Sequence, residues 1–249
     1  MLYDTGLGRD TLNHNLKVLG LKAQNVEAIA MSHGHADHHG GLEGLIQRTG
    51  KRKLPLVLHP DAWQDRKIVF PSGTEIHLPP PNRKMLEDHD VKIVEEKGPS
   101  LLLGDVALVS GQVERTTLFE TGFPIHYARH DGSWEKDPVV YDDQGIILNV
   151  KGKGLVVVSS CSHAGVVNVL RNAQKLTGEK KIHAFIGGLH LSGQIFEPRI
   201  LPTVNELGRI GPNFIVPGHC TGWKATHEIA RWIPQAYVQT SVGTRLEFT

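Results

Sequence analysis

Four histidines and one aspartate lie within seven residues near the start of the chain, in the segment Ser32-His33-Gly34-His35-Ala36-Asp37-His38-His39-Gly40-Gly41. Imidazole and carboxylate groups together suit zinc, iron or manganese. Residues two apart on an extended strand end point to the same side, so His33 and His35 can face one point. Asp37 and His38 follow on the turn into a predicted helix and can face that point from another direction. This short segment can therefore serve two neighbouring metal ions.

The pattern His33-x-His35-x-Asp37-His38 resembles the His-x-His-x-Asp-His signature of the metallo-β-lactamase superfamily. An apolar run that we predict as a strand precedes it, and a helix that begins with Gly-Gly is predicted after it. The alternative is a histidine-rich loop that binds no metal. A purification tag is excluded, because the run is internal and is interrupted by Gly, Ala and Asp.

Three further histidines, His163, His190 and His219, lie just after apolar segments that we predict as strands. Functional side chains of open α/β sheets gather at the carboxyl ends of the strands, so these histidines can project into a shared cleft. We expect two metal-binding triads: His33, His35 and His163 in the first, Asp37, His38 and His219 in the second. Three protein ligands per ion leave a position open for water or substrate. Asp37 is also the candidate catalytic residue, because it could orient the attacking water.

Other candidates have weaker signals. His190 is a reserve ligand, and an equally good interpretation is a pocket histidine that supports a ligand. Asp4 could hydrogen-bond a metal-binding histidine or only stiffen a turn. Cys161 and Cys220 neighbour candidate ligands, but adjacent side chains on an extended segment point apart. We therefore favour small packing residues over metal ligands for both cysteines.

The remaining histidines are not expected to bind metal. His39 is expected to point away from the site and to make a structural hydrogen bond. His227 is expected on the surface of a helix. Most of the other histidines are expected on the surface or in loops, and these are His14, His59, His77, His89, His126, His130 and His183. Asp142 and Asp143 are expected either to contact the site or to begin a strand.

Composition limits the classes of partner. The chain has 249 residues with 27 basic and 26 acidic side chains, so no bulk charge favours a nucleic acid or a membrane. No apolar stretch is long enough to span a bilayer, and no signal peptide is recognised. Two cysteines make no disulfide framework, and we expect a cytoplasmic protein. The expected partner is a small, anionic substrate molecule, and the oligomeric state stays open.

The predicted elements alternate between strands and helices. Helices are predicted over about 11–19, 42–49, 166–176, 201–209 and 225–232. Strands are predicted over 26–31, 54–58, 146–150, 155–159, 182–186, 214–216 and 236–242. The whole chain, 1–249, is predicted to be a single domain. Its variable middle, at about 63–143, has only short strand-like runs and is expected to form the substrate pocket.

An ordered set of motifs sharpens the resemblance to one branch of the superfamily. The set comprises Asp4-Thr5-Gly6, the histidine-rich loop, Asp142-Asp143-Gln144, Cys161-Ser162-His163-Ala164-Gly165 with Asn168, Gly187-Gly188-Leu189-His190-Leu191, and His219-Cys220-Thr221-Gly222. That branch includes a dihydropterin ribofuranosyl-aminobenzene phosphate synthase of methanopterin assembly and many metal-dependent hydrolases. The resemblance implies an α/β fold, an αββα sandwich of the metallo-β-lactamase type that lacks the usual first strand hairpin. It also implies two divalent metal ions, of which Zn²⁺ is favoured and Mn²⁺, Fe²⁺ and Mg²⁺ are alternatives.

One departure from the superfamily pattern concerns a bridging carboxylate. Typical members hold both metals with an aspartate at the end of a strand, but here the strand at 155–159 ends in Ser-Ser-Cys-Ser-His. Val109-Ser110-Gly111-Gln112 also stands where a Gly-His would be expected. His163 is expected to substitute for one of these ligands. The identity of the metal and the filling of both sites therefore stay open.

Three functions fit the sequence. The first, which we favour, is a metal-dependent hydrolase in which water activated by the metal ions attacks a phosphoester, an ester or a lactone. The second is a transferase, implied by the branch, that joins an aminobenzene riboside phosphate to a pterin pyrophosphate. The third is a non-catalytic metal-binding scaffold. Four residues of the variable middle are candidate contacts for a pterin or phosphate or else ordinary loop residues: Arg83, Phe123, Tyr127 and Trp134.

Overall fold

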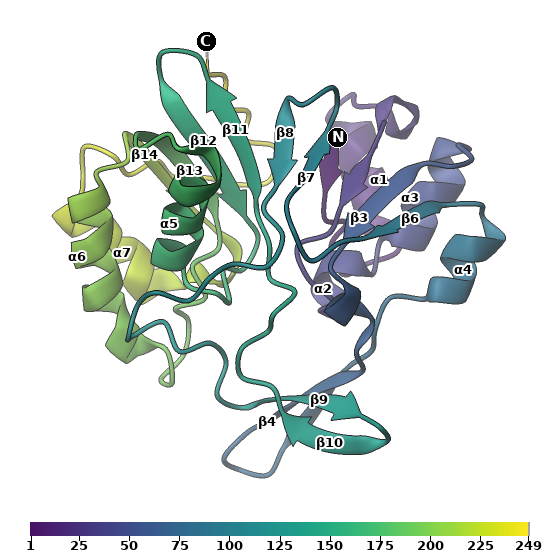
Figure 1. The fold of residues 1–249 in the computed structure, drawn as a ribbon, viewed down its shortest axis with the longest axis horizontal. Coiled ribbons are helices and arrows are strands. Elements are labelled where there is room, and N and C mark those ends of the chain that lie inside the picture. The colour runs from purple at the N-terminus through teal and green to yellow at the C-terminus, as the bar shows by residue number, and fades with distance from the viewer. Residues whose placement is uncertain (249) are drawn as a thin grey trace.

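Two β-sheets pack face to face and carry helices on their outer sides, as Figure 1 shows for residues 1–248, which this computed structural model describes. The first sheet has the order β1-β2-β3-β6, with parallel strands Leu2–Tyr3, Ile29–Ala30, Pro55–Leu58 and Lys92–Glu95. The second has the order β14-β13-β12-β11-β8-β7, with strands Phe214–Pro217, Ile182–Gly187, Gly154–Ser159, Ile146–Val150, Ala107–Val109 and Ser100–Leu102. The predicted αββα arrangement is confirmed.

Buried apolar side chains hold these layers together. Ala30 and Val57 of the first sheet meet Val109 and Ile146 of the second, which joins the sheets directly. The helices α1 (Thr11–Val18) and α3 (Leu42–Thr49) cover the first sheet. The helices α5 (Val166–Thr177), α6 (Ile200–Ile210) and α7 (Trp223–Trp232) cover the second. Because β12 is buried between helices and the other sheet, its sequence is a continuous apolar run rather than an alternating one.

A third sheet extends from the sandwich beside the short helix α2 (Ala36–His39), at the bottom of Figure 1. It is antiparallel, in the order β10-β9-β4-β5, with strands Ser133–Lys136, His126–His130, Arg66–Val69 and Glu75–Leu78. The helix α4 (Arg83–Asp88) follows β5. The sequence did not predict these four strands, because they are short and mix polar with apolar residues, and so carry little apolar periodicity.

Two predicted strands differ from the structure. The strand predicted over 26–31 is only Ile29–Ala30, because the neighbouring strands pair with it at these two residues alone. The strand predicted over 236–242 is absent. Only Tyr237 bridges to Ile215, because the segment hydrogen-bonds to β14 at Ile215 alone, through Ala236 O at 2.7 Å and Val238 N–H at 2.9 Å.

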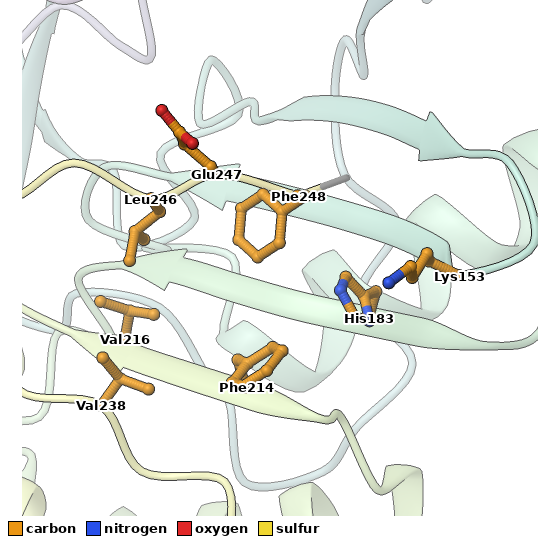
Figure 2. Close-up of a pocket in the computed structure, with 8 residues that line it drawn as sticks. All are labelled: Lys153, His183, Phe214, Val216, Val238, Leu246, Glu247 and Phe248. Carbon is orange, nitrogen blue, oxygen red and sulfur yellow. The ribbon is translucent and has the colours of Figure 1, made fainter.

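A cavity of about 430 Å³ lies at the amino ends of β13 and β14, where Figure 2 shows His183 and Phe214 beneath the C-terminal residues Leu246–Phe248. His190 and His219 follow the opposite, carboxyl ends of the same strands. This cavity therefore lies at the far edge of the sheet from the predicted metal-binding side chains. In the described part of the chain, no helix combines the length and the apolar character that crossing a membrane requires.

Candidate metal centre

Parallel pairing of three strands brings the candidate histidines of the second sheet together. Ser159 at the end of β12 pairs with Gly187 of β13, which in turn pairs with Pro217 of β14. The loops that carry His163, His190 and His219 therefore begin side by side. Gln144 ties the histidine-rich loop of the first sheet to this edge, because its N–H donates to Ser32 O at 3.0 Å and its amide donates to Met31 O at 2.8 Å.

The first predicted triad, His33, His35 and His163, is fully assembled and buried. Their ligand atoms lie within 4.8 Å of one another. His33 Nε2 and His35 Nδ1 are 3.0 Å apart, and the ring of His163 lies 4.7 Å from that of His33 between centroids. Neither ring nitrogen of His163 has a hydrogen-bond partner among residues 1–248. Buried polar atoms without partners are rare, so an ion is a natural occupant of this position.

The second predicted triad, Asp37, His38 and His219, adjoins the first and is open to solvent. Oδ2 of Asp37 lies 3.3 Å from His38 Nε2 and 3.4 Å from His219 Nε2. The side chains of Asp37 and His219 are each 43% exposed, so water can reach them. The rings of His33 and His38 are 4.3 Å apart, which joins the two triads into one centre. All six predicted side chains thus converge, while their binding of metal stays a proposal.

Asp4 holds the histidine-rich loop and one of its rings. Its Oδ1 accepts a hydrogen bond from Ser32 N–H at 2.7 Å, and its Oδ2 accepts one from Ser32 Oγ at 2.7 Å. Oδ2 also lies 2.8 Å from His38 Nδ1, and Ser160 Oγ donates to the same oxygen. This contact turns His38 Nε2 towards Asp37. Asp4 therefore contacts a predicted ligand and does not merely stiffen a turn.

Asp142 fixes the same loop at a second point. Its Oδ2 accepts a 2.7 Å hydrogen bond from the N–H of Gly34, and Arg66 of β4 pairs with both of its oxygens at 2.7 and 2.8 Å. Gly34 is needed here, because a Cβ at this position would lie 2.2 Å from Ala62 O. The other carboxylate, Asp143, accepts a 2.8 Å hydrogen bond from Ala164 N–H beside His163. Both aspartates support the site.

The pKa values divide the centre into a neutral part and a charged part. Burial, reinforced by neighbouring histidines, holds the pKa of His33, His35 and His163 well below the usual value. Burial opposes the charge on His38, but contacts with Asp37 and Asp4 outweigh it and raise the pKa of His38 to about 10. Burial would likewise raise the pKa of Asp37, and its hydrogen bonds to His219 and His38 bring it well below the usual range instead. Neutral imidazoles and an ionised carboxylate are the forms that bind divalent ions, so the first triad and Asp37 are in those forms, whereas His38 would have to release a proton on binding.

His126 is a neighbour of the site that the sequence did not reveal. Its side chain is buried on β9, with Nε2 2.9 Å from His35 Nε2 and Nδ1 2.7 Å from Asp137 O. The expectation of a surface or loop residue is therefore wrong. No local pattern marks His126, because it reaches the centre only through the third sheet. His39 behaves as expected, with Nε2 3.0 Å from Pro79 O.

The cysteines lie closer to the centre than expected. Cys161 Sγ is 3.2 Å from His38 Nε2, so the expectation that it points away from the ligands is wrong. The physical reason is a turn, since Ser162 has φ 55° and the segment is not extended. His190 also lies at the centre, with its ring 4.2 Å from that of His163.

The aromatic side chains of Phe123 and Phe196 border the centre. Phe123 stacks on His163, with centroids 5.6 Å apart and planes at 10°, and lies 5.4 Å from Phe196. Of the four middle residues proposed as substrate contacts, Phe123 is thus beside the candidate ligands. Trp134 instead contacts His77, and Arg83 lies over Trp63.

Comparison with known proteins identifies the family. A model of the metallo-beta-lactamase superfamily matches residues 1–167. The 7,8-dihydropterin-6-methyl-4-(beta-D-ribofuranosyl)-aminobenzene-5'-phosphate synthase of Methanocaldococcus jannaschii is 31% identical over 254 residues, which cover 100% of this chain and 84% of that protein. An uncharacterised protein of the same organism is 30% identical over 235 residues, 93% of this chain and 82% of its own length. The crystal structure of a metal-dependent hydrolase of the beta-lactamase superfamily has a TM-score of 0.81 and 25% identity, and covers 100% of this chain and 89% of its own. This chain belongs to the metallo-β-lactamase superfamily.

Proposed function

We propose that this protein is a metal-dependent hydrolase that cleaves a phosphoester, an ester or a lactone of a small molecule. The observation that carries the proposal is the pair of adjoining triads, one buried and one open to water. His33, His35 and His163 would hold one divalent ion. Asp37, His38 and His219 would hold the other. Zn²⁺ is favoured for these imidazole-rich donors.

Divalent ions at such a centre make a water molecule a better nucleophile at neutral pH and neutralise charge that develops on the substrate oxygen. The chain's own residues supply orientation. The exposed carboxylate of Asp37 can accept a hydrogen bond from the attacking water. Asp4 keeps His38 turned towards Asp37. Asp142 keeps the loop with His33 and His35 in place through Gly34.

A cavity of about 430 Å³ beside His190 is the candidate substrate pocket. Its walls include the apolar side chains of Phe70, Phe123, Ile125 and Phe196. An apolar part of the substrate would lie there, while the anionic or carbonyl group reaches the triads. A cytoplasmic location is part of the proposal, since the two cysteines of the chain are free thiols.

Group transfer is the second candidate. The 31% identity to a pterin-linked synthase along the whole chain favours it, as do the Phe123 and Phe196 rings, which could stack on a planar ring. Ions held by the same triads would then neutralise charge on a departing pyrophosphate, and an arylamine would replace water as nucleophile. The donors cannot distinguish the two reactions, so the test includes both.

The test begins with chelator-stripped protein reloaded with Zn²⁺, Mn²⁺ or Fe²⁺. Phosphodiesters, esters and lactones are assayed in parallel with a pterin pyrophosphate plus an aminobenzene riboside phosphate. We expect metal-dependent hydrolysis, reduced about 100-fold or more in Asp37→Asn. Asp88→Asn, on the exposed face of α4, is the matched control and should match the wild type. Coupling without hydrolysis would select the transferase, and no metal-dependent turnover of any substrate would refute both enzymes.

A further inference from the structure

Two sulfur atoms and an imidazole converge beside the triads and have no part in the proposed reaction. Cys161, His190 and Cys220 place one ligand atom each within 4.8 Å of one another. Cys161 is only 3% exposed, and both cysteines are free thiols. Nδ1 of His190 is buried and has no hydrogen-bond partner in the described range 1–248. An unpartnered buried nitrogen next to two thiols requires a physical explanation.

The backbone is strained at each of the three places that deliver these donors. Ser162, next to Cys161, has φ 55°, His190 has φ 46°, and His219, next to Cys220, has φ 49°. Residues other than glycine rarely adopt this left-handed region, and they keep it where the surrounding structure demands it, typically at functional sites. Three such residues in three separate loops therefore indicate that the fold holds these loops in a common functional arrangement.

Gly188 has no side chain, and this leaves room for the sulfur of Cys220. Gly188 lies between the loops, and a Cβ there would be 2.7 Å from Cys220 Sγ and 2.3 Å from Ser160 O. Any larger residue would push Cys220 away from the Cys161 loop. Cys161 is buried with the apolar core, but Cys220 is only half-buried, so filling of hydrophobic space does not account for the position of Cys220.

We propose that Cys161, His190 and Cys220 form a third metal site, which takes a soft or borderline ion such as Zn²⁺ or Cd²⁺. The donor set, two thiolates and one imidazole, differs from the nitrogen and oxygen donors of the two triads and prefers softer ions. On binding, each thiol gives its proton to solvent, and the sulfur lone pair forms the bond to the ion. Three protein ligands leave a fourth position for water or a small ligand. The proposal holds whether or not the protein is a hydrolase.

The experiment titrates chelator-stripped, thiol-reduced protein with Cd²⁺ and follows the ultraviolet absorption of thiolate-to-cadmium charge transfer. Bound Cd²⁺ per chain is measured in the same samples. We expect wild type to show this absorption and one more bound ion than Cys220→Ser. His190→Gln should also lose that ion. His227→Gln, which removes an exposed imidazole on α7, is the matched control and should match wild type.

Three results would overturn the proposal. The first is the absence of thiolate absorption at saturating Cd²⁺ when thiol titration shows both cysteines reduced. The second is absorption that survives in Cys220→Ser and His190→Gln and is lost only in Cys161→Ser. The sulfur of Cys161 would then bind an ion together with the triad of Asp37, His38 and His219. The third is equal Cd²⁺ content in wild type and Cys220→Ser. Circular dichroism checks the fold of each variant. If Cys161→Ser does not fold, the presence or absence of thiolate absorption in the wild type still tests the proposal.

Discussion

Asp142→Asn should destabilise the protein by about 3–5 kcal/mol, because it leaves a buried guanidinium without its only hydrogen-bonded carboxylate among the described residues. Arg66 is 0% exposed and donates from Nη1 and Nη2 to the two oxygens of Asp142 at 2.8 and 2.7 Å. The third hydrogen bond of Arg66, from Nη2 to Asp61 O at 3.0 Å, has a neutral acceptor and cannot replace the lost charge. Asp137 Oδ2, at 3.9 Å from Nε, is too far away to accept a hydrogen bond. The large cost therefore follows from removing one partner of a fully buried pair.

The pH dependence of this effect has a defined sign. Burial alone would raise the pKa of Asp142, but Arg66 outweighs it and holds that pKa below the usual value. A carboxylate of this kind contributes stability above its unfolded pKa of about 3.9 and loses it as pH falls through the folded pKa. The difference between wild type and Asp142→Asn should therefore be fully present near neutral pH and shrink in acid.

The neighbouring Asp143 supplies a matched control with the opposite sign. Burial raises the pKa of Asp143 to about 6, and no guanidinium pairs with it directly. A carboxyl group whose folded pKa is raised contributes stability at pH values below its unfolded pKa. This stability is lost as pH rises through the folded pKa, and for Asp143 the loss is about 3 kcal/mol between about pH 4 and pH 7. An asparagine can still accept from Ala164 N–H. Asp143→Asn should thus gain stability relative to wild type as pH rises, and at neutral pH it should not be destabilised by more than about 1 kcal/mol.

Urea unfolding of the metal-free proteins is followed by circular dichroism at about pH 3, pH 5 and pH 7. The measurement at about pH 3 tests the acid loss for Asp142, and those at about pH 5 and pH 7 test the opposite trend for Asp143. The double variant Arg66→Met/Asp142→Asn completes a mutant cycle and should recover much of the loss, since the buried guanidinium is removed together with its hydrogen-bonded partner. Equal destabilisation by Asp142→Asn and Asp143→Asn at neutral pH would refute the argument. A double variant whose loss of unfolding free energy equals the sum of the losses in the two single variants would refute the argument as well.

Three further predictions concern the histidine-rich loop. Gly34→Ala should displace the loop and weaken metal binding, because its Cβ would lie 2.2 Å from Ala62 O; unchanged Zn²⁺ affinity by calorimetry would contradict this. Adding Zn²⁺ at about a thousand times its Kd should stabilise the metal-free protein by about 4 kcal/mol and raise its Tm, and a Tm independent of Zn²⁺ would argue against ion binding by the folded state. Asp4→Asn should lower the pKa of His38 from about 10, because Asp4 is one of the two carboxylates that raise it. Nuclear magnetic resonance titration of the metal-free protein measures that pKa, and an unchanged value would show that Asp37 alone sets it.

Much of the centre could be predicted from short-range sequence patterns. The spacing of His33, His35, Asp37 and His38 needs only a strand end followed by a helix start, and both are local features. The same holds for strands such as Ile146–Val150, whose apolar run and following Gly-rich turn match the structure. Histidines directly after apolar strands could be grouped because parallel strands end at a common edge.

The sequence by itself determined which side chains could bind metal, because these depend on residue type and on spacings within one turn or strand. Its resemblance to the metallo-β-lactamase superfamily implied the fold that carries them. The tertiary structure alone decided which distant groups meet. His126 reaches His35 across 91 positions, and Arg66 reaches Asp142 across 76. The turn at Ser162 swings Cys161 towards His38 and Cys220. Such contacts depend on how sheets pair and pack, and no local pattern records that geometry.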